Sequence, residues 1–135
     1  MSELINKILE RDRVLGSLCN EAYFSFQERN YFAAIAYLFI LSEQVLKCSL
    51  DKNNGNFNKC ITEAKNQNKI NNEEKLLLDN VRNIRNAIFH ENNYGLGLPI
   101  DGKLYPIDED ETKKIIFKLY SYPIFKLTVK IIQDK

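Results

Sequence analysis

The segment from Phe32 to Lys47 constrains the fold most, because it is apolar on nearly every side of the helix that its spacing predicts. A helix of this kind must be surrounded by other elements, and Asn30 is placed to cap its N-terminus. The longest apolar run, Tyr31 to Leu41, is well short of the roughly 20 residues that a membrane-spanning helix requires. We therefore expect a central core helix and no membrane span.

Amphipathic segments flank this central helix on both sides. Apolar residues at helical spacing predict one long first helix, from Leu4 to a point between Glu28 and Asn30. A polar linker at 51–56 leads into a weaker helix over 57–65. The helix after that is capped by Asn71 or Asn72. Its expected apolar stripe consists of Leu77, Val81, Ile84 and Ile88.

The last third of the chain combines a hairpin with a helix. Leu98 to Tyr105 is typical of a short β-hairpin, because the Asp-Gly pair at 101–102 suits the positive φ angles of a type I′ turn. Asp108 and Glu111 resemble a capping box that opens a last helix, which Pro123 should kink or divide. The chain is thus expected to form one all-α domain over 1–135, an up-and-down bundle of four or five helices with a β-hairpin insertion near 98–105.

The composition is that of an ordinary globular domain, with 44% apolar and 27% charged residues. A net charge of +1 gives no general attraction to polyanions, so a nucleic-acid site must be a local patch. Cys19, Cys48 and Cys60 contain no CxxC pair and are expected to be reduced and largely buried. The charged N-terminus lacks a signal-peptide core, and we expect a cytoplasmic protein.

The concentrated polar chemistry of the chain lies between Arg82 and His90. With the apolar stripe facing inward, two arginines, two asparagines and the single histidine are expected to face the surface. Arg82, Asn86 and His90 fall on one line of an ideal helix, whereas Arg85 lies roughly 140° from His90. Arginine matches phosphate oxygens, and histidine transfers protons near neutral pH. The cluster therefore suits phosphodiester cleavage, with Arg82 and Asn83 as candidate RNA contacts.

Attack by a ribose 2′-hydroxyl on its own phosphate needs a base, an acid and charge stabilisation, but no metal. One chain supplies one histidine. Two chains on a two-fold axis would bring two histidines and at least two arginines into one cleft, so this chemistry predicts a homodimer. A lone histidine without clustered thiols argues against a metal site, and we expect no cofactor.

The stretch Arg85-Asn86-Ala87-Ile88-Phe89-His90 is an arginine, a polar residue, three free positions and a histidine, and here the sequence resembles the HEPN family. The segments 31–36 and 43–47 also look like the alanine-rich second helix of that family. HEPN domains are small helical bundles that dimerise, and many are metal-independent ribonucleases in toxin–antitoxin, abortive-infection and CRISPR systems. The resemblance implies that Arg85 and His90 are catalytic and that Asn86 orients or assists them.

The resemblance also bears on regulation. In a subset of these toxins, a tyrosine two residues after the histidine is adenylylated by a partner nucleotidyltransferase. This chain has Asn92 at that position, and Tyr94, two residues further on, is the candidate for modification. A nucleotidyltransferase-type antitoxin is therefore the partner that the resemblance implies.

Three interpretations remain open. The first is a dimeric endoribonuclease that acts on RNA as a toxin or antiviral defence effector. The second is a non-catalytic HEPN-like module that binds a nucleotide, RNA or a protein. The third is a structural adaptor in which His90 caps its helix and the arginines are either solvated or paired with Asp79 and Glu91.

Two further patterns have both a nucleic-acid and a structural interpretation. Aromatic residues between Tyr23 and Phe39 suggest base stacking, but their helical spacing favours the core. Lysines along the last helix suggest an RNA-binding face, but a solvated helix surface is the expected account. These lysines are Lys113, Lys114, Lys118, Lys126 and Lys130.

Overall fold

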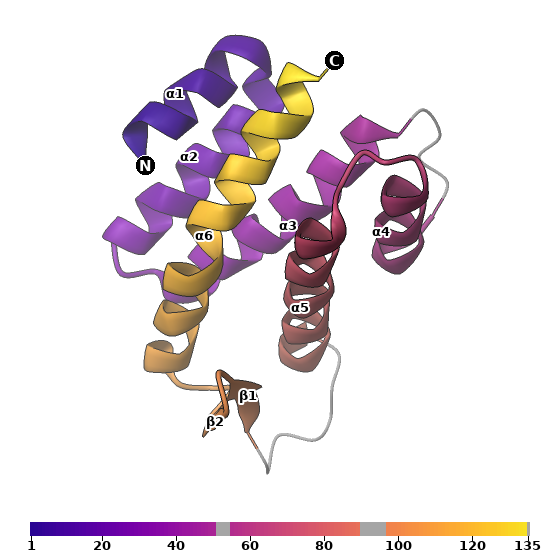
Figure 1. The fold of residues 1–135 in the computed structure, drawn as a ribbon. Coiled ribbons are helices and arrows are strands. Elements are labelled where there is room, and N and C mark those ends of the chain that lie inside the picture. The colour runs from indigo at the N-terminus through magenta and orange to yellow at the C-terminus, as the bar shows by residue number, and fades with distance from the viewer. Residues whose placement is uncertain (51–54, 90–96, 135) are drawn as a thin grey trace.

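A computed structural model of the chain describes residues 1–50, 55–89 and 97–134 (Figure 1). These residues form helices and one two-stranded antiparallel sheet, which confirms the expected all-α bundle with a short hairpin. The helices are α1 (Ser2–Arg11), α2 (Arg13–Gln27), α3 (Tyr31–Ser49), α4 (Phe57–Asn66), α5 (Asn72–Phe89) and α6 (Asp110–Gln133). The strands are β1 (Leu98–Ile100) and β2 (Lys103–Tyr105).

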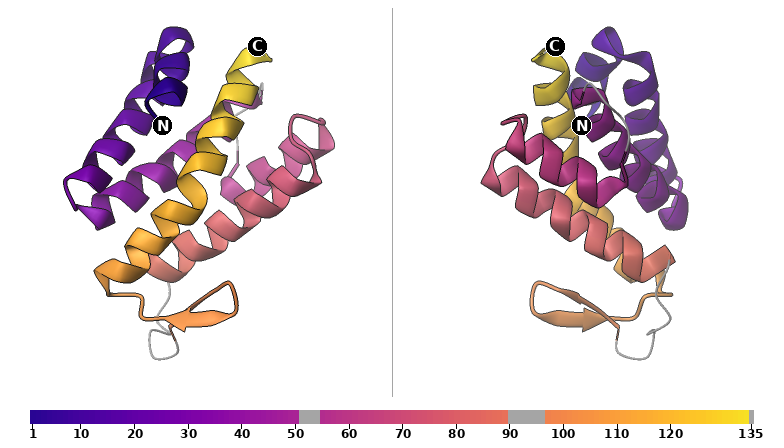
Figure 2. Two further views of the ribbon diagram at one scale, coloured as in Figure 1. Left: turned by 60° about the vertical axis from the view of Figure 1, so that its left-hand side comes forward. Right: turned by 90° about the vertical axis from the view of Figure 1, so that its right-hand side faces the viewer.

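Helix α3 is the central element, as its all-round apolar surface predicts. Helices α1, α2 and α6 lie on one side of it, and α4 and α5 lie on the other (Figures 1 and 2). Asn30 caps α3 by accepting a hydrogen bond from the backbone N–H of Ala33. Its fully buried side chains include Ile35, Leu38, Leu41 and Leu46. The core of the bundle is therefore built around α3.

The hydropathy of α3 has a structural explanation. By length and composition alone this helix is apolar enough to cross a membrane, a test that the core helices of soluble proteins also pass. In the bundle, α3 packs against α2, α4, α5 and α6. These contacts account for the buried apolar side chains of α3, while Phe32 and Ile40 remain about half exposed.

The expected long first helix is wrong, because the chain breaks at Asp12. Asp12 has an extended backbone, and its carboxylate accepts a hydrogen bond from the N–H of Leu15 at 3.0 Å, so that it caps α2. Gly16 permits close approach of the two helices, since a Cβ there would lie 2.7 Å from the Cα of Leu9. The division gives six helices in the described residues instead of four or five.

The hairpin has the predicted turn. Leu98 pairs with Tyr105, and Asp101 and Gly102 have φ angles of 50° and 79°, as a type I′ turn requires. Leu98 and Ile100 are buried. The hairpin thereby closes the end of the bundle at which α5 ends and α6 begins (Figures 1 and 2).

The start of α6 differs from the expected capping box. The helix begins at Asp110, and its N-cap residue, Glu109, makes no side-chain cap hydrogen bond. The preceding segment is held instead by Thr112 and Lys113, which donate to the backbone carbonyls of Pro106 and Asp108. Because α6 starts one residue later than a cap at Asp108 requires, Asp108 and Glu111 do not form a capping box. Helix α6 continues through Pro123 to Gln133, so the proline does not divide it.

Candidate active site

Helix α5 carries most of the candidate site, and its start is fixed by a reciprocal cap. The Asn71 side chain accepts from the N–H of Glu74, and the Glu74 carboxylate accepts from the N–H of Asn71, both at 2.8 Å. Asn71 is therefore the cap, and Asn72 is the first helical residue. The inward stripe is Leu78, Val81 and Ile84, while Leu77 and Ile88 are only half-buried.

The C-terminal turns of α5 lie along α3 in the opposite chain direction. The Phe89 ring meets Phe39 and Phe32 edge to face, with ring centroids 5.7 and 5.8 Å apart. One turn earlier on α5, Arg85 meets Glu43, which is one turn later on α3. This packing fixes the position of the Arg85 guanidinium relative to α3.

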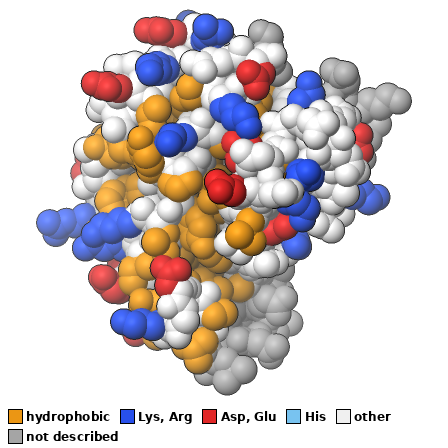
Figure 3. Space-filling view, in the orientation of Figure 1, with side chains coloured by type: hydrophobic (Ala, Val, Ile, Leu, Met, Phe, Trp, Pro, Cys, Tyr) orange, Lys and Arg blue, Asp and Glu red, His pale blue; other side chains and the backbone are white. Residues whose placement is uncertain are grey.

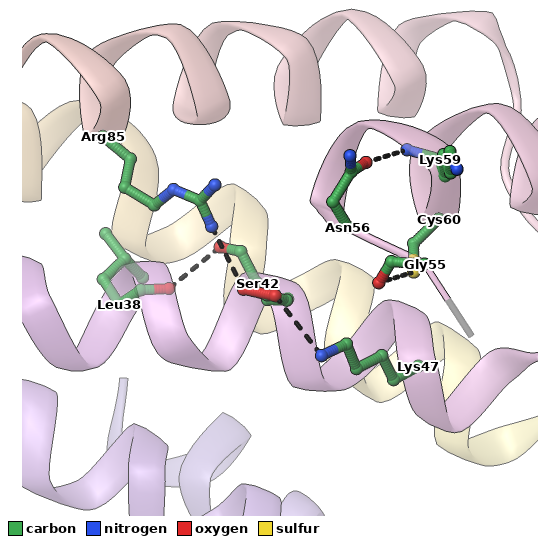
Figure 4. Close-up of polar contacts among 9 residues, drawn as sticks. Leu38, Ser42, Lys47, Gly55, Asn56, Lys59, Cys60 and Arg85 are labelled. Atoms are coloured by element: carbon green, nitrogen blue, oxygen red, sulfur yellow. Dashed lines mark hydrogen bonds and ion pairs between the residues drawn. The ribbon is translucent and has the colours of Figure 1, made fainter. Parts of the chain in front are cut away.

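Arg85 does not face the surface as expected. Its guanidinium donates a hydrogen bond to the Glu43 carboxylate at 3.1 Å and lies 4.8 Å from the centroid of the Phe57 ring on α4. Figure 4 shows this side chain reaching from α5 toward α3. The side chain is 21% exposed. A carboxylate and an aromatic face on neighbouring helices draw the cation into the junction of α3, α4 and α5.

The ion pair is part of a short charge row. The second Glu43 oxygen lies 3.4 Å from Nζ of Lys47, so one carboxylate lies between two cations. The neighbouring thiol of Cys60 has its pKa raised, mainly by burial, with Lys47 lowering and Glu43 raising it by smaller amounts. Among the described residues, this charge row is the part of the candidate site that lies between α5 and α3.

The other predicted residues have different environments. Arg82 and Asn86 are half-buried, and Asn83 is exposed. The Nε atoms of Arg82 and Arg85 are buried and have no hydrogen-bond partner in the part of the chain that the structure describes. His90 and Tyr94 lie outside the described residues, as does Glu91. The structure thus places Arg82, Arg85 and Asn86 together on the last turns of α5.

Sequence reasoning missed Glu43 and Phe57 as partners of Arg85. The available signal was that Glu43 is the one carboxylate in the apolar stretch from Tyr31 to Ser49, because a charge in such a helix needs a partner. The alternative pairing of an arginine with Asp79 does not occur, since Asp79 pairs with Lys75 at 2.7 Å.

The aromatic residues were expected in the core and the lysines of the last helix in solvent, and each expectation is only partly met. Phe39 is buried, but Phe24 and Phe32 are more than half exposed. Lys113 is buried, and Lys130 pairs with Glu74 on α5 at 2.6 Å. On the face shown in Figure 3, blue and red groups are interspersed around a hydrophobic area over α6 and the hairpin. No single basic patch dominates that face.

An open cavity of about 550 Å³ lies beside the end of α5. Its walls come from the start of α3, the end of α5, the segment that leads into α6 and the first turn of α6. The lining residues are Phe32, Ile88, Ile107, Asp108 and Lys113. Among the described residues no group of three or more histidine, cysteine or acidic side chains is arranged to hold a metal ion. The site is therefore an arginine-bearing helix end next to a largely apolar cavity.

Comparison with known proteins adds no further assignment. No protein-family model, no curated protein and no solved structure matches the chain. The class that the fold defines is an all-α bundle with a β-hairpin, and function has to be argued from the site.

Proposed function

We propose that the chain is a metal-independent endoribonuclease of the HEPN type, with Arg85, Asn86 and His90 as its catalytic residues. The observation that carries the proposal is the fixed position of Arg85. Glu43 and Phe57 hold its guanidinium at the end of α5, five residues before His90 in the chain. A guanidinium whose orientation is set before substrate binds can stabilise a phosphorane without reorganisation.

Each residue type has a role in this reaction. His90 takes the proton of the ribose 2′-hydroxyl or returns a proton to the departing 5′-oxygen. Arg85 donates to the non-bridging phosphate oxygens. Asn86, the next residue on α5, holds the phosphate or the imidazole. The 2′-oxygen displaces the 5′-oxygen, which leaves a 2′,3′-cyclic phosphate and a 5′-hydroxyl. Arg82 and Asn83 contact the RNA strand.

The active unit is proposed to be a two-fold homodimer. Proton transfer is needed at two oxygens, and each chain has one histidine. Arginines that meet at a two-fold axis repel one another, so apolar contacts must hold the two chains together. Ile40 and Phe89, 46% and 38% exposed, supply apolar surface on α3 and at the end of α5.

In the cell, such an enzyme fits a cytoplasmic toxin or antiviral defence effector. Uncontrolled RNA cleavage would harm its host, so a regulator is required. A nucleotidyltransferase-type antitoxin acting on Tyr94 is the regulator proposed here, because Tyr94 follows the catalytic histidine closely in the chain.

The ion pair itself favours a second candidate. Glu43 occupies donors of Arg85 that a phosphate would otherwise use, and it offsets the positive charge. A non-catalytic helical module that binds a nucleotide, RNA or a protein would tolerate this arrangement. The two candidates differ in whether His90 is required.

The test is RNA cleavage by purified protein in excess EDTA. We expect cleavage products with cyclic phosphate ends, no cleavage of an all-deoxy substrate, and no activity in His90→Ala. Strict dependence on magnesium or efficient cleavage of DNA would contradict the mechanism. Equal RNA binding by wild type and His90→Ala, without cleavage by either, would support the non-catalytic module.

A further inference from the structure

The cavity beside α5 combines apolar walls with two groups of opposite charge. Phe32, Ile88 and Ile107 supply the apolar walls, and Asp108 and Lys113 supply the polar ones. Its volume of about 550 Å³ is within the usual range for a small-molecule site, roughly 300–1,000 Å³. Because Ile88 lies two residues before His90, the cavity adjoins the proposed catalytic segment.

Lys113 is unusual because its charged side chain is buried, with 9% of the residue exposed. Its ammonium donates to the backbone carbonyl of Asp108 at 3.1 Å. The Asp110 carboxylate lies 3.9 Å away, too far for a hydrogen bond. An ammonium has three N–H donors. One of them holds the Lys113 ammonium in position, and the other two can donate to a group bound in the cavity.

Asp108 supplies the complementary group. Its carboxylate has no hydrogen-bond or ion-pair partner within residues 1–50, 55–89 and 97–134. The cavity therefore offers a two-oxygen acceptor and a cationic donor, together with the Phe32 ring, which is 52% exposed. A ligand that satisfies all three is flat and carries adjacent donors on one edge and an acceptor on another.

We infer that this cavity binds a guanine base of the RNA substrate. Guanine presents two neighbouring donors, N1–H and the 2-amino group, which match one carboxylate. Its O6 and N7 are acceptors for an ammonium. Single-stranded RNA is recognised in this way, by stacking of unpaired bases on aromatic side chains and hydrogen bonds to their edges. Asp108 and Lys113 are specificity-determining residues, and Phe32 is the stacking surface.

The local charge selects a neutral base over a phosphate. Asp108 lines the cavity together with Lys113, and the Asp110 carboxylate lies 3.9 Å from the Lys113 ammonium, so a phosphate here would meet two acidic residues and one cation and would be repelled overall. Adenine and cytosine each lack the paired donors that a carboxylate accepts. The expected result is cleavage beside guanine in single-stranded RNA. This specificity rests on the proposed ribonuclease function, but binding of the free base does not.

The experiment measures binding of uncharged nucleosides by titration calorimetry or NMR, together with cleavage of a mixed-sequence RNA. We expect guanosine to bind at least about tenfold more tightly than inosine, which lacks the 2-amino group, or adenosine. Asp108→Asn and Lys113→Met should each weaken guanosine binding by about tenfold and flatten any guanine preference in cleavage. The exposed Asp101→Asn and the neighbouring Lys114→Met are the matched controls and should bind guanosine like wild type.

The outcomes separate the two proposals. Selective guanosine binding that is lost in Asp108→Asn, in a protein that does not cut RNA, supports this base site and contradicts the ribonuclease. Cleavage without guanine preference, with guanosine and adenosine bound equally, contradicts the base site alone. If Lys113→Met does not fold, the comparison of inosine with guanosine on wild type and Asp108→Asn still decides the inference.

Discussion

The Arg85 guanidinium and the Glu43 carboxylate form an ion pair at 3.1 Å between helices α5 and α3, across 42 positions of sequence. The pair ties the proposed catalytic helix to the central helix of the bundle. It gives Glu43 a positioning role toward Arg85, and it couples the proposed activity to packing at the junction of α3, α4 and α5.

Replacing Glu43 with glutamine should lower cleavage while the fold persists. The amide keeps the shape of the side chain but removes the charge that orients Arg85, so we expect roughly 10- to 100-fold lower kcat with a smaller change in KM. The free energy of unfolding should fall by about 1 kcal/mol, since the pair is half-buried. Glu21→Gln, on the exposed surface of α2, is the control. Faster cleavage by Glu43→Gln would mean that the ion pair restrains Arg85.

The substitution Arg85→Ala should reduce both activity and stability. From the sequence alone it is expected to leave folding intact, because the side chain was predicted to face solvent. In the structure, alanine would remove the contact with Phe57 and leave Glu43 with Lys47 as its partner. We expect a loss of about 1–2 kcal/mol in urea unfolding, in addition to loss of cleavage. An unchanged unfolding midpoint would show that the guanidinium makes no net contribution to packing.

The cap of α5 predicts a stability difference between two adjacent asparagines. Asn71→Ala removes one side of the reciprocal bonds with Glu74 and should cost about 1 kcal/mol. Asn72→Ala changes an exposed residue in the first turn and should be nearly neutral. Thermal unfolding of both variants checks whether Asn71 is the cap. Equal losses of stability in the two variants would contradict this.

Burial of Cys19 predicts a pH-dependent loss of stability. Burial raises the pKa of its thiol from 9.0 to about 12. The folded state therefore keeps a proton that the unfolded state releases, so stability is complete below pH 9 and falls as the pH rises toward 12. For this one group, the free energy of unfolding falls by at most about 1.4 kcal/mol per pH unit. Urea unfolding between pH 8.5 and 10.5 should give a shallower decline for Cys19→Ala than for wild type. Parallel declines would contradict the assignment.

Local signals in the sequence predicted the elements well. The Asn30 cap and the Asp-Gly turn at 101–102 depend on neighbouring backbone groups alone, and both occur as expected. The break at Asp12 was missed because apolar spacing continues across it, while the close contact of Gly16 with Leu9 exists only after folding. The predicted cap at Asp108 failed because α6 begins at Asp110, so that Glu109 and not Asp108 is the N-cap residue.

The candidate site was less predictable than the fold. Residue types on α5 identified Arg82, Arg85 and Asn86, but the direction of Arg85 depends on Glu43 and Phe57, which are distant in sequence. A helical wheel for α5 contains no information about partners on other helices. The cavity could not be predicted for the same reason, because its walls come from segments that are distant in the sequence.

The most direct test of the central claim is complementation between two inactive variants, Arg85→Ala and His90→Ala, after verified subunit exchange. Each mixed dimer keeps one Arg85 and one His90, contributed by different chains, so a shared cleft predicts that RNA cleavage in EDTA reappears in part, more slowly than in the wild type because one of the two histidines is missing. Each variant alone should remain inactive. If the mixed dimers stay inactive while wild-type monomers at high dilution still cut RNA, the two-fold catalytic cleft is contradicted.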